Sequence, residues 1–242
     1  MYVGGATHLL LQAVYYGIRP PYQLGLIVQE MDYIGIRSLT VVNVIAIFAG
    51  MVLALQTAYA LSRFGAKGFI GVVVAISMVR EIGPVFTAIM VGGRVGSGIT
   101  AEIGSMKVTE QIDAIRVMGA NPVKKLVVPK LVATVLVLPL LTIVADILGI
   151  LGGLIISVLE LQVNSYYYFT TILENISLQD MASGVGKAFF FGFIIAVIGC
   201  YQGMVTKGGT EGVGRSTTTT VVLVSIMVLV SDFFLTKLFM LL

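Results

Sequence analysis

Hydrophobic residues gather in five long segments, and each has at least the roughly 20 residues that a helix needs to cross a membrane. The segments span residues 40–61, 69–100, 131–159, 185–204 and 221–242. The second is too long for one simple crossing and contains Gly83-Pro84, where the missing backbone donor of proline predicts a kink. The pattern therefore predicts an all-α integral membrane protein with five transmembrane helices.

The segment before the first span, residues 6–36, is less hydrophobic and is interrupted by Pro20-Pro21. Apolar residues still recur there at helical spacing, with polar residues on the other side: Leu24, Ile27, Val28, Met31 and Ile34 against Gln23 and Glu30. A helix with this pattern lies in the membrane interface instead of crossing it. We therefore expect an N-terminal interfacial helix.

The longest polar stretch of the chain, residues 102–129, lies between the second and third spans. A helix over residues 104–118 would have an apolar stripe and a charged face, made by Val108, Ile112, Ile115 and Met118 and by Lys107, Glu110, Asp113 and Arg116. Gly119 predicts its end, and Asn121-Pro122 prevents continuation. The pattern leaves two interpretations open: a coupling helix that docks a cytoplasmic motor, or an interfacial helix on lipid headgroups.

Basic residues near the ends of the spans predict the orientation, because Lys and Arg are enriched in cytoplasmic loops. One side carries seven of them: Lys107, Arg116, Lys124, Lys125, Lys130, Lys207 and Arg215. The opposite side carries four, Arg63, Lys67, Lys187 and Lys237. This count places residues 104–118 in the cytoplasm, together with an N-terminal segment that holds Arg19 and Arg37.

Composition excludes several classes of function. With 57% hydrophobic and 11% charged residues among 242, and a mean hydropathy of +1.02, the chain is one membrane domain (1–242) without room for a soluble catalytic domain. The net charge of +3 is scattered, so nucleic acid is not expected as a partner. The only histidine, His8, has no neighbouring ligand cluster, so no metal site is expected.

Residues 209–216 match the phosphate-binding loop pattern except that Arg215 stands in place of lysine. A true phosphate loop follows a strand in an α/β domain, whereas this segment joins two membrane helices. We therefore expect no nucleotide or other cofactor on this chain, and we expect Ser216 and Thr217 to cap the last helix.

Charged residues inside the predicted spans are the candidate functional residues, because ionised groups in lipid cost several kcal/mol unless paired or hydrated. Arg80 and Glu81 are adjacent and point about 100° apart on a helix, so each is expected to meet another helix or a wet cavity. Gln56, a polar residue of the first span, is expected to face other helices or a cavity. A structural ion-pair network is the alternative interpretation, and the acids Asp146 and Asp232 leave an ion-coupled carrier open.

Three segments together resemble the MlaE family of ABC-transporter permeases, which act in lipid trafficking between the membranes of diderm bacteria. They are GMVLALQTAYALSRFGA at 50–66, REIGPVFTAIMVGGRVGSGITAEIGSMKVTEQIDAIRVMGANPVKKLVVPK at 80–130 and GTEGVGRSTTTTVV at 209–222. The resemblance implies a multi-pass permease of the bacterial inner membrane that moves phospholipid or a related lipid. It also implies a homodimer with two separate ATPase subunits, which bind ATP and Mg, and an outer MCE-domain partner.

The same resemblance implies roles for individual residues. Residues 104–118 match the coupling helix, with Lys107, Glu110, Asp113 and Arg116 near the ATPase contact. Gln56, Arg80 and Glu81 match polar residues beside the lipid cavity, and the intramembrane Arg94 lies in the same matched segment. The alternatives are an ion-coupled secondary carrier and a membrane-bound lipid-modifying enzyme, although one His, one Cys and isolated acids form no catalytic set.

Overall fold

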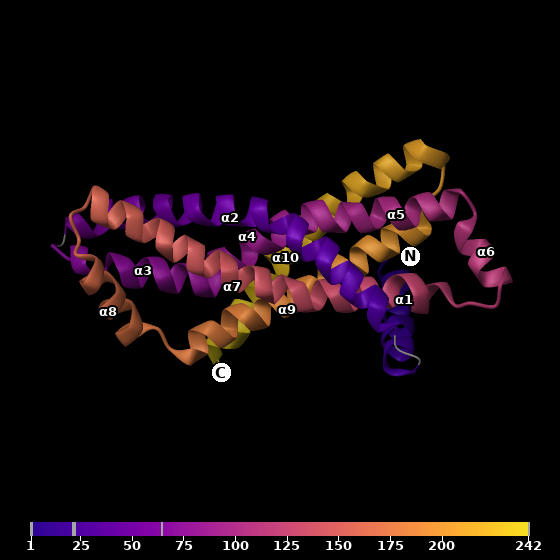
Figure 1. Cartoon of the computed structure of the whole chain (residues 1–242), viewed down its shortest axis with the longest axis horizontal. Helices are drawn as coiled ribbons and strands as arrows, with labels where there is room; N and C mark the ends of the chain where they lie inside the picture. Colours follow the sequence, from indigo (N-terminus) through magenta and orange to yellow (C-terminus); the bar gives the residue numbers. More distant parts are fainter. Residues whose placement is uncertain (1, 21–22, 64, 242) are drawn as a thin grey trace.

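Five long helices run side by side in the computed structural model, which describes residues 2–20, 23–63 and 65–241 (Figure 1). The helical rods that are long and apolar enough to cross a membrane are Leu24–Ser62, Lys67–Val108, Val123–Leu159, Leu178–Val205 and Gly209–Leu241. No strand occurs in the described residues. The predicted all-α membrane architecture with five spans and an N-terminal helix is therefore confirmed.

The elements follow one another in a simple order. They are α1 (Tyr2–Ile18), α2 (Leu24–Ser62), η1 (Lys67–Phe69), α3 (Ile70–Ser77), η2 (Met78–Ile82), α4 (Gly83–Val91), η3 (Gly92–Gly96), α5 (Ser97–Val108), α6 (Gln111–Val117), η4 (Val123–Val127), α7 (Val128–Leu159), α8 (Ser165–Asn175), α9 (Leu178–Val205) and α10 (Gly209–Leu241). We call the two ends of the bundle the α6 end and the α8 end, because these short helices lie at opposite extremes of the long axis in Figure 1.

The rod of the second span is interrupted by two π-helical turns, η2 and η3. The first directly precedes Gly83 and Pro84, which begin α4. Proline displaces the turn before it, and a widened turn accommodates the displacement. The irregularity predicted at Gly83-Pro84 therefore takes the form of a π-helix, a feature often found at functional sites.

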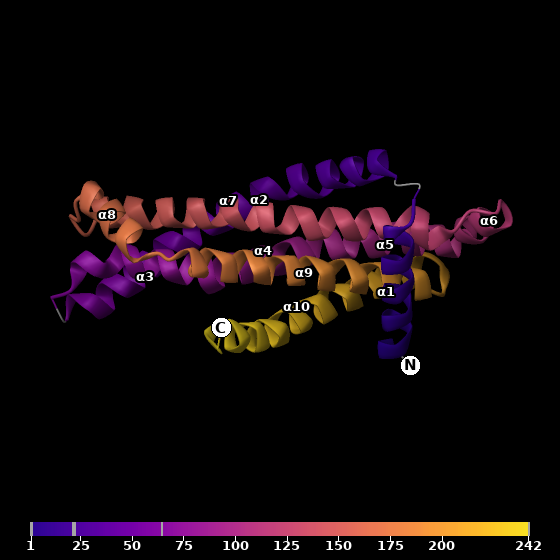
Figure 2. The same ribbon diagram turned by 90° about the horizontal axis from the view of Figure 1, so that it is seen from below.

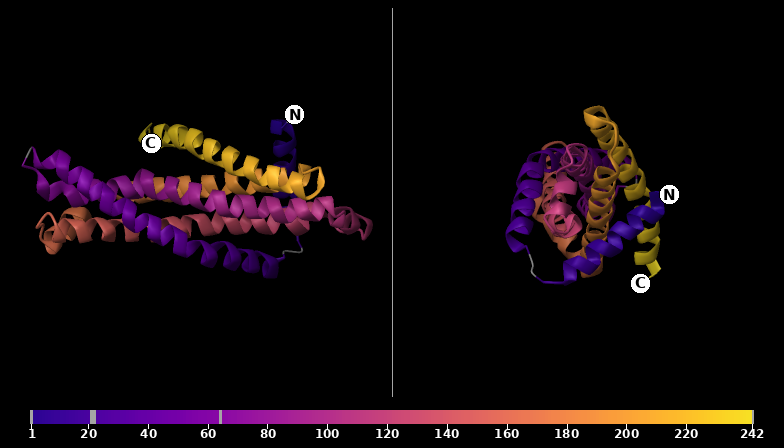
Figure 3. Two further views of the ribbon diagram at one scale, coloured as in Figure 1. Left: turned by 90° about the horizontal axis from the view of Figure 1, so that it is seen from above. Right: turned by 90° about the vertical axis from the view of Figure 1, so that its right-hand side faces the viewer.

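The N-terminal segment differs from the prediction. Residues 24–36, expected as part of an interfacial helix, form the first turns of α2 and continue without a break into the first span. Only α1 is separate, and Figures 2 and 3 show it running across the long axis of the bundle. A helix with this direction lies along a membrane surface when the bundle crosses the membrane.

The prediction of a single helix over residues 104–118 is wrong. The α5 helix ends at Val108, Glu110 adopts a left-handed conformation with φ of 59°, and α6 begins at Gln111. The predicted end at Gly119 is confirmed, since its φ is 78° and its N–H donates to the Arg116 carbonyl at 2.9 Å. The break turns α6 across the end of the bundle.

Two predicted connections contain more helix than expected. The segment between the third and fourth predicted spans holds α8, and the segment before the fifth predicted span belongs to α10 from Gly209 onward. Ser216 and Thr217 lie inside α10, where Thr217 donates to the Gly214 carbonyl at 2.7 Å, so they do not cap it. The segment that resembles a phosphate loop is therefore helical.

Close packing between α2 and α7 depends on glycine. A Cβ at Gly50 would overlap the backbone carbonyl of Gly149, and a Cβ at Gly152 would overlap the carbonyl of Ile47. Backbones approach this closely in membrane helices where small residues meet. By contrast, only 11% of the residues in the most hydrophobic part of α10 are buried, so most of the surface of this helix is left for lipid or another chain.

Candidate functional site

A buried lysine organises the charges inside the spans. Lys187 of α9, with a side chain only 1% exposed, lies 2.6 Å from Glu81 Oε2 in η2 and 3.1 Å from Asp232 Oδ1 in α10. Its Nζ also donates to Thr236 Oγ1 at 2.6 Å and to the Arg80 carbonyl at 3.1 Å. These contacts bring three of the five membrane rods together around one ammonium group.

Arg80 makes a second link to the same helix. Its Nη1 donates to Asp180 Oδ1 at 3.2 Å, near the start of α9. Asp180 is itself fixed by a capping box, in which Ser177 Oγ accepts from the Asp180 N–H and the Asp180 carboxylate accepts from the Ser177 N–H. Arg80 and Glu81 therefore pair with different residues of α9 and not with each other, as expected for adjacent residues of a helix.

Partial exposure distinguishes this cluster from an ordinary buried ion pair. The side chains of Glu81 and Arg80 are 39% and 31% exposed, whereas Lys187 is enclosed. The ammonium thus holds the cluster together, and the outer carboxylate and guanidinium face the surface of the bundle. Groups of both signs at one membrane depth can bind the charged parts of a polar headgroup.

The other intramembrane residues of the prediction lie elsewhere. Arg94 of η3 donates to Ser38 Oγ of α2 at 2.7 Å. Gln56 is exposed on α2, so it does not face other helices of this chain, and the other expectation, that it faces a cavity, stays a prediction. The structure therefore unites Arg80 and Glu81 in one cluster and places Gln56 and Arg94 outside it.

Lys187 is the residue that sequence reasoning missed, since it was counted among the outer basic residues. The signal was present, because Lys187 falls inside the predicted span 185–204, and in the structure it lies more than two turns from the start of α9. Lys130, counted on the cytoplasmic side, is buried as well. If Lys187 and Lys130 are left out of the count, the cytoplasmic side still has three more basic residues than the opposite side, so the predicted orientation does not depend on them.

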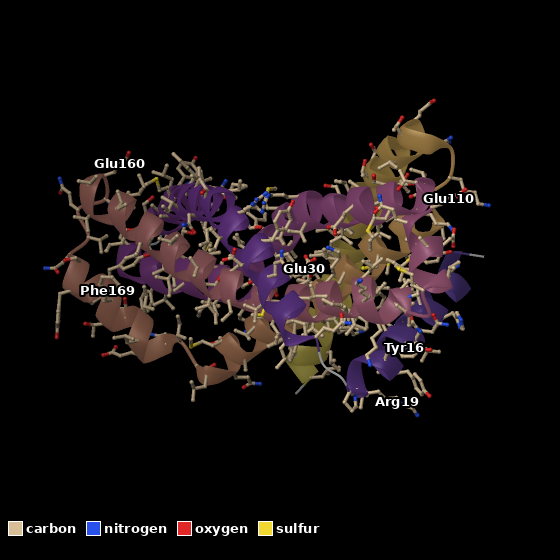
Figure 4. The ribbon with its side chains drawn as sticks, turned by 45° about the vertical axis from the view of Figure 1, so that its right-hand side comes forward. Tyr16, Arg19, Glu30, Glu110, Glu160 and Phe169 are labelled. Atoms are coloured by element: carbon tan, nitrogen blue, oxygen red, sulfur yellow. The ribbon has the colours of Figure 1, made fainter. Side chains whose placement is uncertain are left out.

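Lys130 forms another three-helix junction, nearer the α6 end. Its Nζ lies 2.6 Å from Glu30 Oε1 in α2 and 2.7 Å from Glu102 Oε2 in α5. The lysine is 3% exposed, Glu30 is 22% exposed and Glu102 is 51% exposed. We call these three residues the Lys130 junction, and Figure 4 labels Glu30 within the bundle.

The α6 helix is anchored on one side and open on the other. Ile112 and Ile115 are buried, which confirms two positions of the predicted apolar stripe, whereas Val108 is half-buried and Met118 is 72% exposed. Val117 is 89% exposed beside it. Large apolar side chains in an otherwise polar, exposed segment are typical of a protein contact surface.

Three of the four charged residues predicted for this face come together. Lys107 Nζ lies 2.9 Å from Asp113 Oδ2, and Arg116 Nη1 lies 3.2 Å from Asp113 Oδ1. The hydrogen bond from Lys107 and the two positive charges hold the pKa of Asp113 below its ordinary value. Glu110 stands at the turn, exposed at the α6 end in Figure 4, while Glu160 and Phe169 lie at the other end.

Comparisons with known proteins agree with this architecture. The family model described as Permease MlaE matches residues 27–238. A probable ABC transporter permease protein of Rickettsia felis is 44% identical over 237 residues, which cover 98% of this chain and 92% of the relative. The intermembrane phospholipid transport system permease protein MlaE of Haemophilus influenzae is 37% identical over 212 residues, 87% of this chain and 81% of the relative. The chain therefore belongs to the MlaE family of ABC-transporter permeases.

Proposed function

We propose that this permease moves phospholipid or a related lipid between the inner and outer membranes of a bacterium, driven by a separate ATPase. The observation that carries the proposal is the form of α6, a short helix anchored by Ile112 and Ile115 and exposing Val117 and Met118 at one end of the bundle. In this proposal two ATPase subunits bind ATP and Mg, this chain binds no cofactor, and α6 is the cytoplasmic coupling helix.

Force applied to α6 acts directly on a membrane span. The α6 helix follows α5 after a two-residue turn, and the Lys107–Asp113 ion pair joins the two helices across that turn. The α5 helix in turn belongs to the same rod as Glu81 and Arg80. Binding and hydrolysis of ATP in the partner would therefore reposition the charged cluster through one continuous helix.

A lipid needs both an apolar chamber and a place for its headgroup. Each CH₂ of an acyl chain gains about 0.8 kcal/mol on leaving water, which requires an apolar path. Arg80 and Glu81 supply partly exposed charges at membrane depth for the headgroup. Gln56 and the exposed apolar residues of α2 face outward, so we assign them to a chamber shared with a second copy of the chain.

At the α8 end we propose that an MCE-domain lipid-binding subunit receives or delivers the lipid. The α8 helix exposes Tyr166 and Leu173 by 80% and 79%, which suits both a membrane interface and such a contact. The Haemophilus influenzae relative is named as the permease of an intermembrane phospholipid transport system, and this name supports phospholipid as the cargo.

The test separates ATPase docking from folding. We would purify the chain from native membranes with its partners and measure ATP-dependent transfer of fluorescent phospholipid between vesicles. Val117→Glu combined with Met118→Glu should remove the ATPase from the purified complex and reduce transfer at least tenfold. Leu159→Glu, at a residue 75% exposed at the opposite end, is the matched control and should retain the ATPase. Retention of the ATPase and full transfer by the double variant would exclude α6 as the docking site.

A further inference from the structure

Asp146 is a buried acid that the charged cluster does not use. It lies in α7 with 8% of its surface exposed, and its Oδ1 is buried with no hydrogen-bond partner among the described residues. A Cβ added at Gly83 would overlap this oxygen and would lie 2.9 Å from the Met78 carbonyl oxygen. The carboxyl group and that carbonyl oxygen therefore both border the space that a side chain at Gly83 would fill.

The ion pairs of the spans leave Asp146 without a cation. The elements packed against this part of α7 that carry charges are η2 with Arg80 and Glu81, α8 with Glu174, and α9 with Asp180 and Lys187. The charged residues of α2, which are Glu30, Asp32 and Arg37, lie near its start, where Glu30 pairs with Lys130 at the beginning of α7. Arg80 is paired with Asp180, and Lys187 is paired with Glu81 and Asp232. Within residues 2–20, 23–63 and 65–241, no Lys or Arg nitrogen lies within the 4 Å of Asp146 that would define an ion pair.

An ionised carboxylate in this position would be unfavourable for two reasons. Charge buried in a membrane without a partner costs several kcal/mol. The Met78 carbonyl oxygen beside Oδ1 is also an acceptor. It already accepts the Gly83 N–H in the π-helical turn, and it has no proton to donate to a carboxylate. A proton between the two oxygens removes both problems, since a carbonyl oxygen can accept a second hydrogen bond.

We propose that Asp146 is a proton-binding site: it is held as a neutral carboxylic acid that donates towards the Met78 carbonyl of η2. The acid then joins α7 to the π-helical turn without placing a charge in the membrane. This inference rests on the surroundings of Asp146 and is independent of the transport function proposed above.

A groove gives uncharged reagents access to the acid. It has a volume of about 350 Å³, Asp146 forms part of its wall, and the other lining residues are almost all apolar, including Val79, Ile143, Ile147, Ile172 and Leu178. The groove lies beneath the bend between α8 and α9, where Ile147 and Leu178 are 54% and 86% exposed. A small hydrophobic molecule dissolved in lipid can therefore reach Asp146.

Hydrophobic carbodiimides are the chemical class that this site would take. The acid gives its proton to one carbodiimide nitrogen, and its oxygen bonds to the central carbon, forming an O-acylisourea. Migration of the acyl group to nitrogen then yields a stable N-acylurea. The protein gains the whole reagent, with no leaving group and no change of oxidation state. An ionised carboxylate brings no proton for the first step.

The experiment uses the full chain in native membranes with its partners. Dicyclohexylcarbodiimide is added at pH 7, and the modified carboxyl is located by peptide mass spectrometry. We expect one adduct at Asp146, at least tenfold above the adducts at Asp180, Glu81 and Asp232, and its complete loss in Asp146→Asn. A cationic water-soluble carbodiimide with an added amine should instead modify the exposed Glu110 and leave Asp146 unmodified.

Two results would overturn the proposal. One is an unmodified Asp146 in wild-type protein whose other acids react. The other is equal modification of Asp146 by the cationic reagent, which would show that the carboxyl group is open to water and is not enclosed as the proposal requires. The wild-type measurement decides the matter even where a variant folds poorly. Asp146→Asn retains a donor towards Met78, so its thermal midpoint should match that of wild type, and a fall of more than a few degrees would contradict the neutral-acid assignment.

Discussion

Replacing Lys130 tests how the three helices of the Lys130 junction are held together. The lysine is nearly enclosed and touches two carboxylates at 2.6 and 2.7 Å, so Lys130→Met leaves Glu30 and Glu102 facing each other without a cation. Removing one partner of a fully buried pair costs about 3–5 kcal/mol. Because Glu102 is half exposed and retains much of its hydration, we expect about 3 kcal/mol, near the lower limit of that range.

The two acids should contribute unequally. Glu30 is 22% exposed and Glu102 is 51% exposed, so water screens the second pair more strongly. Exposed pairs contribute about 0.2–1 kcal/mol, which we expect for Glu102→Gln. Glu30→Gln should cost roughly 1–2 kcal/mol, between the exposed and buried cases. The triple variant that combines Lys130→Met, Glu30→Gln and Glu102→Gln leaves no unpaired charge and should recover most of the stability lost in Lys130→Met alone.

Thermal unfolding in a mild detergent measures these differences. For a chain of this size, 1 kcal/mol corresponds to about 2–4 °C in Tm, so Lys130→Met should lower Tm by roughly 6–12 °C. Lys125→Met is the matched control, because Lys125 is exposed and lines the same surface groove as Lys130. The reasoning is refuted by an equal loss in the control, or by a triple variant that is no more stable than Lys130→Met.

Two further predictions concern helix packing and α6. Gly50→Ala should lower stability by about 1–3 kcal/mol in the same assay, because its Cβ would overlap the Gly149 carbonyl; Gly25→Ala, where no atom lies within 4 Å of a Cβ, should not. The pKa of Asp113 is depressed in the folded state, so its ion pairs stabilise the fold of α6 fully above the ordinary carboxyl pKa. This stabilisation is lost as pH falls through the pKa of the folded state. A spin label on α6 should therefore gain mobility only in acid, whereas Asp113→Asn should be mobile throughout; pH-independent mobility in wild type would contradict this.

The spans were predictable because lipid imposes a simple requirement: about 20 apolar residues with their backbone groups satisfied within a helix. The pairing of charges was not, because it depends on how helices rotate and slide against one another. Lys187 shows this clearly. Its pairing with Glu81 joins residues 106 positions apart, a relation that no local spacing contains.

Helix boundaries failed where tertiary contacts outweigh local pattern. The sequence pattern placed Glu30 on the polar side of an interfacial helix, but Lys130 neutralises it and lets α2 continue into the membrane. The break at Glu110 had no sequence signal, since a left-handed conformation is rare for a residue with a Cβ. The turn persists because Ile112 and Ile115 are buried on the far side of it.

The rod from Lys67 to Val108 connects both parts of the proposed function. Glu81 and Arg80 lie in its first π-helical turn, Arg94 lies in its second, and α6 extends from its end. A π-helical turn holds its backbone hydrogen bonds in a wider ring, so a shift to α-helical spacing rotates the residues on one side of it relative to the other. In the proposed function, a pull on α6 reaches Glu81 as a rotation, and Lys187 in α9 is the fixed partner relative to which Glu81 moves. Coupling of this kind requires no nucleotide-binding residue in the permease itself.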